Sequence, residues 1–343
     1  MEDISLIYYV NFVTLSFLAV FYNKNAKGLL YLAFVYLSLL VAIRHNVGND
    51  YVNYVRLFDE TSFKTLFNDA TEVEYGAFGS MALFKLMGLG IPYWFFTMSF
   101  MTFFTLFKGL ERMGFGNIWW SLLIYYSFFF LMNHCNIMQH GVMTGWIWLA
   151  FSYINSNPKK YFIYCLIGAS FHILGLFFIP FYWILRRNIS VKIAMYAFGF
   201  AIVFNFFFKD LLFSFLNFGY IGYKIQYYSS AYFQGQEINK SISLGVIVYF
   251  FLLLLLYLFK IERKSENFNV LRNALLLSIF FQVGFKGTGI FDARIGGVFN
   301  ISLVILIPLF LNYLAPRFFY ATKVVVLIYA FLLFVVTSTN PSN

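Results

Sequence analysis

The sequence predicts an all-α polytopic membrane protein, a multi-span helical bundle without a separate soluble domain. Of its 343 residues, 61% are apolar and only 11% are charged, whereas soluble domains carry about 25% charged residues. Several apolar runs reach the roughly 17–25 residues that cross a bilayer as a helix. The runs are continuously apolar and do not alternate with polar residues, which argues against a transmembrane β-barrel.

About ten spans are expected from these runs. They cover residues 3–22, 29–43, 92–107, 118–132, 140–156, 192–208, 243–261, 274–291, 296–314 and 324–338. Glu2 and Asp3 precede the first span, where a signal peptide would have basic residues, so we expect an uncleaved helix. Cys135 and Cys165 lie in separate segments and provide neither a disulfide framework nor a metal-binding spacing.

The apolar stretch 161–185 is either one long span or a re-entrant helix pair broken at Phe171–His172. Lys159–Lys160 precedes it and Arg186–Arg187 follows it. Cytoplasmic loops collect Lys and Arg, so both pairs are expected inside, which requires the re-entrant pair. This topology places both termini outside and most basic residues inside. The net charge of +10 is therefore mainly an orientation signal and not a nucleic-acid footprint.

The same topology gathers the unusual polar stretches on the outer face. An external loop with a surface helix is expected over 44–91, and a second external loop over 209–242. The polar stretches 133–139 and 291–297 lie on this face as well, as does the break at His172. The chain 1–343 is expected to form a single transmembrane domain whose functional residues face outward.

The stretch RHNVGNDYVNY, which starts at Arg44, is the first candidate site. A basic residue at a helix end often only extends to the membrane interface, and this alternative holds for Arg44 alone. Here, however, Gly48 permits a tight backbone, and Asp50, Tyr51 and Tyr54 follow. Arginine binds phosphate in bidentate geometry, tyrosine rings stack on sugars, and a carboxylate can act as a general base. Together these residues indicate one wall of a substrate site.

Further polar residues can face the same site. Glu74 lies where the chain re-enters the apolar layer. His134 and Gln139 lie at the outer junction of two spans, where they either cap helix ends or bind substrate, and the spacing to His140 is not typical of a metal site. His172 lies within an apolar stretch, where a histidine faces a cavity or satisfies the backbone freed by a helix break.

The stretch QVGFKGTGIFDARIGG, at 282–297, is the second candidate. Lys286 and Arg294 can complete, together with Arg44, a cationic pocket that suits a pyrophosphate at the level of the lipid headgroups. The alternative is a surface pair of Asp292 with Arg294, with Lys286 extending to the interface.

The loop 209–242 contains a tyrosine-rich stretch that includes Tyr223 and Lys224. Such a stretch forms either an aromatic belt at the membrane interface or a platform for carbohydrate. Lys224 among the tyrosines favours an anionic glycan. The sequence contains neither a Gly-rich phosphate loop nor an Asp-x-Asp metal motif, so an external transferase would need a donor already delivered across the membrane.

The order of these elements resembles the EpsG-like family of bacterial polysaccharide polymerases, which are related in role to the O-antigen (Wzy-type) polymerases. Met138 stands where the family pattern has an arginine, which shifts the expected phosphate contacts to Arg44 and Arg294. The resemblance covers about residues 30–310 and rests on Arg44, Gly48, Asp50, Tyr51, Tyr54, Asn136, Gln139, Ala169, Phe171, His172, Ala293, Arg294 and Phe299.

The resemblance implies a glycosyltransferase of the GT-C type. Cationic side chains near the headgroup level could stabilise a leaving diphosphate without a metal, so we expect no metal or other cofactor. It would join oligosaccharide repeat units carried on undecaprenyl pyrophosphate, in O-antigen or another surface polysaccharide. Its site would face the periplasm or exterior of the bacterial inner (plasma) membrane. Membrane lipid, a chain-length regulator and a flippase are the expected partners, and nucleic acid is not.

The chemistry of the candidate side chains gives each a role in such a reaction. Asp50 would orient or deprotonate the acceptor hydroxyl, with His172 or His134 in reserve for the same role. Arg44, Arg294 and Lys286 would hold the donor pyrophosphate. The glycan would contact Tyr51, Tyr54, Glu74, Gln139, Tyr223 and Lys224.

Two other classes of function fit the same residues. A transporter or flippase of lipid-linked glycans also needs a basic cavity, but transporters typically show repeat symmetry and mid-membrane polar residues. Here the polar residues lie at the outer edge, which favours the polymerase. An O-antigen ligase or a glycan acyltransferase is the other alternative, and the sequence does not separate a ligase from the polymerase.

Overall fold

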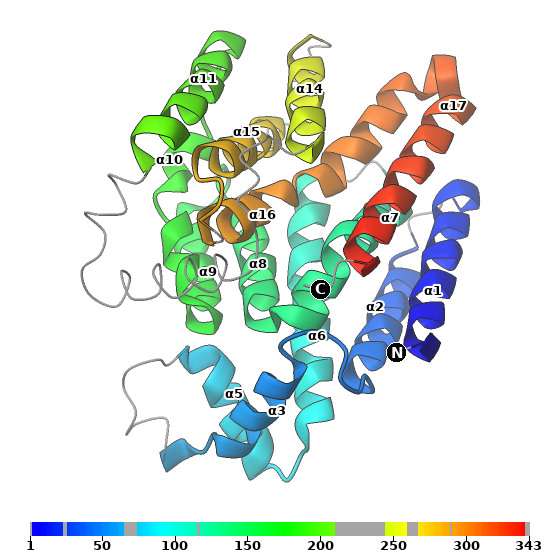
Figure 1. The fold of residues 1–343 in the computed structure, drawn as a ribbon, viewed down its shortest axis with the longest axis vertical. Coiled ribbons are helices and arrows are strands. Elements are labelled where there is room, and N and C mark those ends of the chain that lie inside the picture. The colour runs from blue at the N-terminus through cyan, green and yellow to red at the C-terminus, as the bar shows by residue number, and fades with distance from the viewer. Residues whose placement is uncertain are drawn as a thin grey trace. The chain divides into compact units, whose positions relative to one another are not determined.

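The computed structural model describes residues 2–22, 26–64, 74–114, 117–209, 244–258, 267–288 and 290–339. Within these ranges all regular secondary structure is helical, which confirms the predicted all-α class. Figure 1 shows these helices coloured in chain order. The chain divides into two compact units. The first unit comprises Met1–Tyr182 and Val304–Asn343, and the second comprises Trp183–Leu303.

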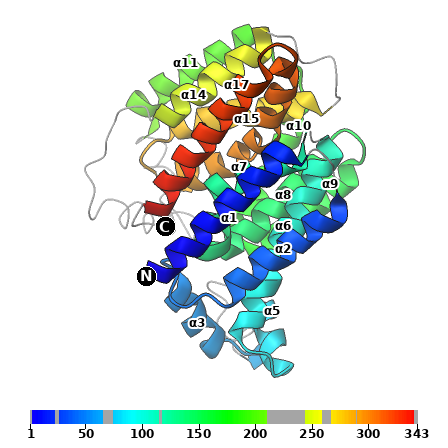
Figure 2. The same ribbon diagram turned by 90° about the vertical axis from the view of Figure 1, so that its right-hand side faces the viewer.

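The first unit is built around α6, which packs against α2 on one side and α8 on another (Figure 2). Its described helices are α1 (Glu2–Phe21), α2 (Lys27–Ala42), α3 (Tyr51–Glu60), α5 (Tyr75–Leu86), α6 (Ile91–Met113), α7 (Ile118–Tyr125), the π-helix η1 (Tyr126–Asn136), α8 (Met138–Phe151), α9 (Pro158–Phe171), the 3-10 helix η2 (Ile173–Phe178), the start of α10 (Phe181–Leu185) and nearly all of α17 (Leu303–Thr339).

Polar residues at helix starts determine where several of these helices begin. The Asn117 side chain accepts a hydrogen bond from the backbone N–H of Trp119 at 3.0 Å, and Asn157 accepts one from Lys160 at 3.1 Å. Each satisfies a donor that has no partner within the first helical turn. Pro158 occupies the first position of α9, where its missing N–H costs nothing.

The core of the first unit combines large aromatic rings with close helix contacts. Phe34 of α2 stacks on Phe103 of α6 at a centroid distance of 5.1 Å. On the other side of α6, a Cβ atom at Gly109 would lie 2.7 Å from the Trp148 backbone, and one at Gly145 would meet the side chain of Thr105. Small residues therefore let α6 and α8 approach closely, as is common between membrane helices.

The second unit contains α11 (Val191–Phe207), α14 (Leu244–Leu258), α15 (Phe268–Gly284), the π-helix η4 (Ile290–Ile295) and α16 (Gly296–Asn300). α15 begins before the expected span 274–291, because Arg272 and Asn273 are buried and bonded. The Asn273 amide donates to the carbonyl of Leu185 at 3.0 Å, and Arg272 donates to Asn188 at 3.0 Å. These bonds attach the start of α15 to the turn after α10.

The expected number of spans and the outside position of both termini stay predictions. Tyr320–Ser338, in α17 (Leu303–Thr339), is long and apolar enough to cross a membrane, and the pair Phe291–Asn300 and Leu303–Leu311, bent by 42°, also qualifies as one span. The shorter apolar helices of 10–17 residues are Leu6–Phe21, Lys27–Ala42, Val191–Phe207, Gly245–Leu258 and Phe268–Gly284. A single helical element, α17, takes up the last expected span and most of the one before it.

Exposed side chains on several helices are large and apolar. Val13 and Phe17 of α1, Phe206 and Phe207 of α11, and Val325 of α17 are all more than half exposed. Large apolar side chains exposed together on one helix are typical of contact with lipid or a partner. The exposed apolar helices agree with a membrane protein.

α9 ends at Phe171 and His172 is extended (φ −154°), so the helix breaks where the sequence predicted. The stretch 44–91 contains the predicted helix, α5, and also α3, which was not predicted. α3 is amphipathic, because Tyr54 and Phe58 are buried on one face.

Candidate functional site

Arg44 lies just beyond the end of α2 and is almost fully buried, at 4% exposure. Its Nη1 donates to the carbonyl of His134 at 2.9 Å, and its guanidinium lies 4.5 Å from the centre of the Phe95 ring. The carbonyls in the last turn of a helix have no partner within it, so Arg44 caps the end of η1. Among the described residues, Nε of Arg44 has no hydrogen-bond partner.

The loop after Arg44 is closed by Gly48 and Asn136. Gly48 has φ +90°, and a Cβ atom there would meet the Cys135 carbonyl and lie 2.6 Å from the Asn136 side chain. The Asn136 side chain accepts a hydrogen bond from the backbone N–H of Asn49 at 3.0 Å. Glycine is needed here for both its conformation and its size. The contact brings the two predicted stretches, 44–54 and 133–140, together.

Tyr51 and Tyr54 follow on α3, and both rings contact Phe95 beside Arg44. The ring of Tyr51 is 5.8 Å from the Arg44 guanidinium. Tyr54 is buried and packs on Trp94 and Phe95. Burial, and then the nearby carboxylate of Asp50, raises the pKa of Tyr54, so its hydroxyl stays protonated at neutral pH. Asp50 itself is half-buried at the N-terminus of α3.

Glu74 and His172 meet at the break between α9 and η2. The carboxylate of Glu74 lies 3.8 Å from Nδ1 of His172, and it accepts a hydrogen bond from the N–H of Ile173 at 3.4 Å. His172 Nδ1 also accepts from the N–H of Leu174 at 3.3 Å. Both side chains therefore accept hydrogen bonds from backbone N–H groups that the helix break leaves without helical partners. The ring of His140 packs at a right angle to that of His172, 5.5 Å away.

His134 and Gln139 hold different positions in this cluster. His134 is fully buried, and its ring nitrogens hydrogen-bond to Ser99 Oγ at 2.7 Å and to the Tyr125 hydroxyl at 2.9 Å. The geometry therefore gives His134 a structural position. The backbone of Gln139 lies near the Tyr54 hydroxyl and acts to lower its pKa, against the larger effect of burial. The side-chain Nε2 of Gln139 is buried and has no partner among the described residues.

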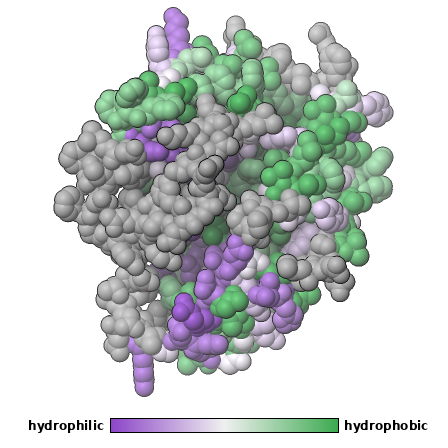
Figure 3. Space-filling view, in the orientation of Figure 1, coloured by the Kyte–Doolittle hydropathy of each residue, from purple (hydrophilic) through white to green (hydrophobic). Residues whose placement is uncertain are grey.

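These contacts join most of the predicted site residues of the first unit into one cluster, which we call the Arg44 cluster. In Figure 3 hydrophilic residues gather over the region of α3 and α5, close to the loop that carries several of its members. Within the described ranges no three His, Cys, Asp or Glu side chains are grouped as metal ligands would be. The cluster consists of Arg44, Asn49, Asp50, Tyr51, Tyr54, Glu74, Asn136, Gln139, His140 and His172.

Lys286 and Arg294 belong to the second unit. Arg294 is half-buried in η4, and the Asp292 carboxylate accepts bonds from the N–H of Gly287 at 2.8 Å and of Ala293 at 2.7 Å. Asp292 therefore shapes the turn between α15 and η4. A pocket that combines Arg44 with Lys286 and Arg294 stays a prediction, and Tyr223 and Lys224 lie outside the described residues.

Some members of the site carried no signal in the sequence. Phe95 supports the Arg44 guanidinium, but it is one of many phenylalanines in an apolar run. Ser99 and Tyr125 hold His134, and both lie within expected spans. A polar or aromatic residue inside an apolar helix reveals its role only when its neighbour is known.

Comparison with known proteins places the chain in a family. The model of the EpsG family matches residues 27–342, nearly the whole chain. No curated protein and no solved structure matches it. The match covers the described residues of the Arg44 cluster as well as η4 with Arg294. The chain is a member of the EpsG family, whose members are polysaccharide-polymerase-like membrane proteins.

Proposed function

We propose that this protein is a glycosyltransferase that polymerises oligosaccharide repeat units from undecaprenyl-pyrophosphate-linked donors. The growing polysaccharide is an O-antigen or another surface polymer, and the site faces the outside of the bacterial inner membrane. Family membership supports the class of reaction. The chemistry of the Arg44 cluster supports the kind of donor.

The buried charge of Arg44 carries this proposal. Burying an unpaired cation is costly unless something compensates it. Among the described residues Arg44 makes no ion pair, and its Nε lacks an acceptor. An anionic ligand such as a diphosphate would supply both the charge and the acceptor. Two aromatic rings, Phe95 and Tyr51, hold the guanidinium in place for it.

In the proposed reaction a hydroxyl of the acceptor sugar attacks the anomeric carbon of the donor. The bond between this carbon and the pyrophosphate oxygen breaks, and Arg44 stabilises the negative charge that develops on the leaving diphosphate. The hydroxyl proton passes to a carboxylate. Asp50 is the proposed base, and the Glu74–His172 pair is the second candidate. Tyr54 keeps its proton and can donate to a sugar oxygen.

Reconstitution with a purified lipid-linked repeat unit tests the proposal. The wild-type protein is expected to produce a ladder of polymer on a gel. Arg44→Lys keeps the charge but loses the planar donors, so we expect at least a hundredfold slower extension from the loss of an electrostatic contact to the leaving group. Arg56→Lys, on the exposed face of α3, is the matched control and should leave the ladder unchanged.

A second arm addresses the base. Asp50→Asn keeps the shape of the side chain but removes its proton acceptor, so chain extension should fall while lipid-linked donor still binds. Normal polymer from both Arg44→Lys and Asp50→Asn would sink the proposal. Wild-type protein that forms no ladder but moves glycan across liposomes would instead establish a flippase, and transfer of one intact chain to a lipid acceptor would establish a ligase.

A further inference from the structure

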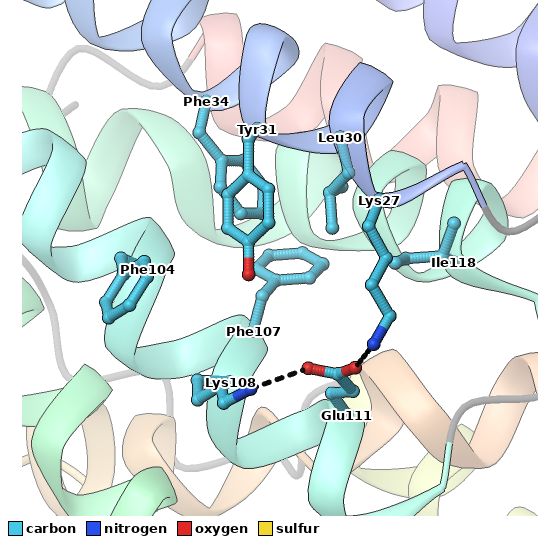
Figure 4. A pocket seen from close by; sticks show the side chains of 9 residues that line it. All are labelled: Lys27, Leu30, Tyr31, Phe34, Phe104, Phe107, Lys108, Glu111 and Ile118. Atoms are coloured by element: carbon cyan, nitrogen blue, oxygen red, sulfur yellow. Dashed lines mark hydrogen bonds and ion pairs between the residues drawn. The ribbon is translucent and has the colours of Figure 1, made fainter.

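A pocket of about 120 Å³ lies at the opposite end of α2 from Arg44. Lys27 begins α2 and Arg44 follows its end, so the 16-residue helix, with a rise of about 1.5 Å per residue, separates the two sites by roughly 24 Å. Figure 4 shows the pocket between α2 and α6. It is distinct from the Arg44 cluster and has no part in the proposed polymerisation.

The rim of the pocket carries three charged side chains. The Glu111 carboxylate pairs with Lys27 from α2 and with Lys108 at 3.3 Å. Lys27 first, and then Lys108, lowers the pKa of Glu111, and Glu111 raises the pKa of Lys27. Glu111 and Lys27 are therefore charged at neutral pH. Two cations face one carboxylate, so the rim keeps an excess positive charge.

The interior of the pocket is apolar. Leu30 and Phe34 follow Lys27 on the same face of α2, at helical spacing. Across the pocket lies Phe107 of α6, so one face of each helix lines the space. These three side chains are buried. The pocket thus has a cationic mouth and an aromatic floor, which suits an amphiphile with a negative head.

On one side the pocket reaches the surface of the protein at Phe104. Phe104 is 43% exposed, and its ring lies 6.2 Å from that of Tyr31. In Figure 4 the Tyr31 hydroxyl is directed from α2 toward α6, between the charged rim and the Phe104 ring. If the headgroup of a ligand lies between the two lysines, its apolar chain can extend past Phe104 into the lipid.

We propose that this pocket binds an anionic phospholipid of the inner leaflet. Lys27 and Lys108 bind the headgroup phosphate, and the first part of an acyl chain lies against Tyr31 and Phe104. Basic pockets between membrane helices on the cytoplasmic side bind anionic headgroups in this way. The basic residues at this end of α2 and α6 are those that the sequence places inside. A lipid bridging both helices stabilises their packing.

Lipid binding to the purified protein tests whether the ligand is an anionic phospholipid or free phosphate. Phosphatidylglycerol titrated into the detergent-solubilised protein should raise its Tm and stay bound in native mass spectra, whereas phosphatidylcholine should do neither. Inorganic phosphate at the same concentration should have no effect. A Tm rise from phosphate alone, or equal binding of both lipids, would overturn the proposal.

Three variants localise the site. Lys27→Gln with Lys108→Gln should weaken phosphatidylglycerol binding by about 25-fold, since each lysine near an anionic headgroup is worth about fivefold. Glu111→Gln should tighten binding, because it removes the competing carboxylate. Lys159→Gln with Lys192→Gln removes the same charge from two exposed residues expected on the same face and should not change binding. Unchanged binding in the Lys27 and Lys108 double variant, or an equal loss in the control, would refute the site.

Discussion

At the scale of single residues, the Arg44 cluster uses the same side chains for folding and for the proposed chemistry. Arg44 caps η1 while its Nε stays available, and Asn136 closes the loop that contains Asp50. Substitutions here change stability and activity together. Variants that keep one property and remove the other are therefore the informative ones.

Gly48→Ala should destabilise the protein by about 2–5 kcal/mol, as the sum of left-handed strain and overpacking against residues 135 and 136. Gly88→Ala is the matched control, because Gly88 also has positive φ (+70°) but no atom within 4 Å of a built Cβ. It should cost only the strain, about 1–2 kcal/mol. Thermal unfolding in detergent measures both. Equal losses would show that the contact with Asn136 does not constrain the loop.

The pH dependence of stability should report on His134. Burial, and then Arg44, lowers the pKa of this ring, so the folded protein keeps it neutral. The unfolded chain takes up a proton as pH falls through about 6.5. Stability is therefore fully present above pH 6.5 and declines below it, by at most about 1.4 kcal/mol per pH unit.

His134→Gln should flatten this decline, whatever it does to stability at neutral pH. His45→Gln, at an exposed histidine of the same region, should leave the slope unchanged. Unfolding measured at pH 7.5, 6.5 and 5.5 separates the two variants. An identical slope for the wild type and His134→Gln would show that the buried ring does not control the acid limb.

At the scale of elements, the break between α9 and η2 is the feature that brings Glu74 to His172. A continuous helix through 171–173 would satisfy its own backbone. The break leaves the N–H groups of Ile173 and Leu174 without helical partners. Glu74 accepts a hydrogen bond from the first, and His172 accepts one from the second. The sequence showed the break and left open whether His172 serves the backbone or a substrate. In the structure His172 accepts a hydrogen bond from the backbone of Leu174.

Glu74→Gln separates these roles. The Gln carbonyl can still accept from Ile173, so thermal stability should change by less than about 1 kcal/mol. Glu74→Ala removes the acceptor and should cost about 1–3 kcal/mol. If Glu74 takes part in proton transfer, Glu74→Gln loses chain extension at normal stability. Full activity of Glu74→Gln would leave Asp50 as the base and Glu74 as a cap.

At the scale of the whole molecule, orientation in the membrane decides what each site can reach. The two cysteines of the chain are buried, so a single introduced cysteine reports its own accessibility. Val52 of α3 is 64% exposed, and Lys159 at the start of α9 is exposed as well. The predicted topology places them on opposite faces.

An impermeant maleimide added to intact spheroplasts should label Val52→Cys and not Lys159→Cys, and inverted vesicles should give the reverse. The wild-type protein, with its buried thiols, is the blank. Labelling of Lys159→Cys from the outside would invert the proposed orientation. It would also place the phospholipid pocket in the outer leaflet.

The sequence by itself determined the helical class and the family. Composition, the length of apolar runs and the motif from Arg44 to Tyr54 are local properties that need no neighbours. The tertiary structure decided what these residues contact. It showed that Arg44 is buried against Phe95, that His134 is held by Ser99 and Tyr125, and that α15 begins at buried polar residues. Such facts depend on which side chains meet across helices, and in a chain with 49 phenylalanines periodicity alone does not determine these pairings.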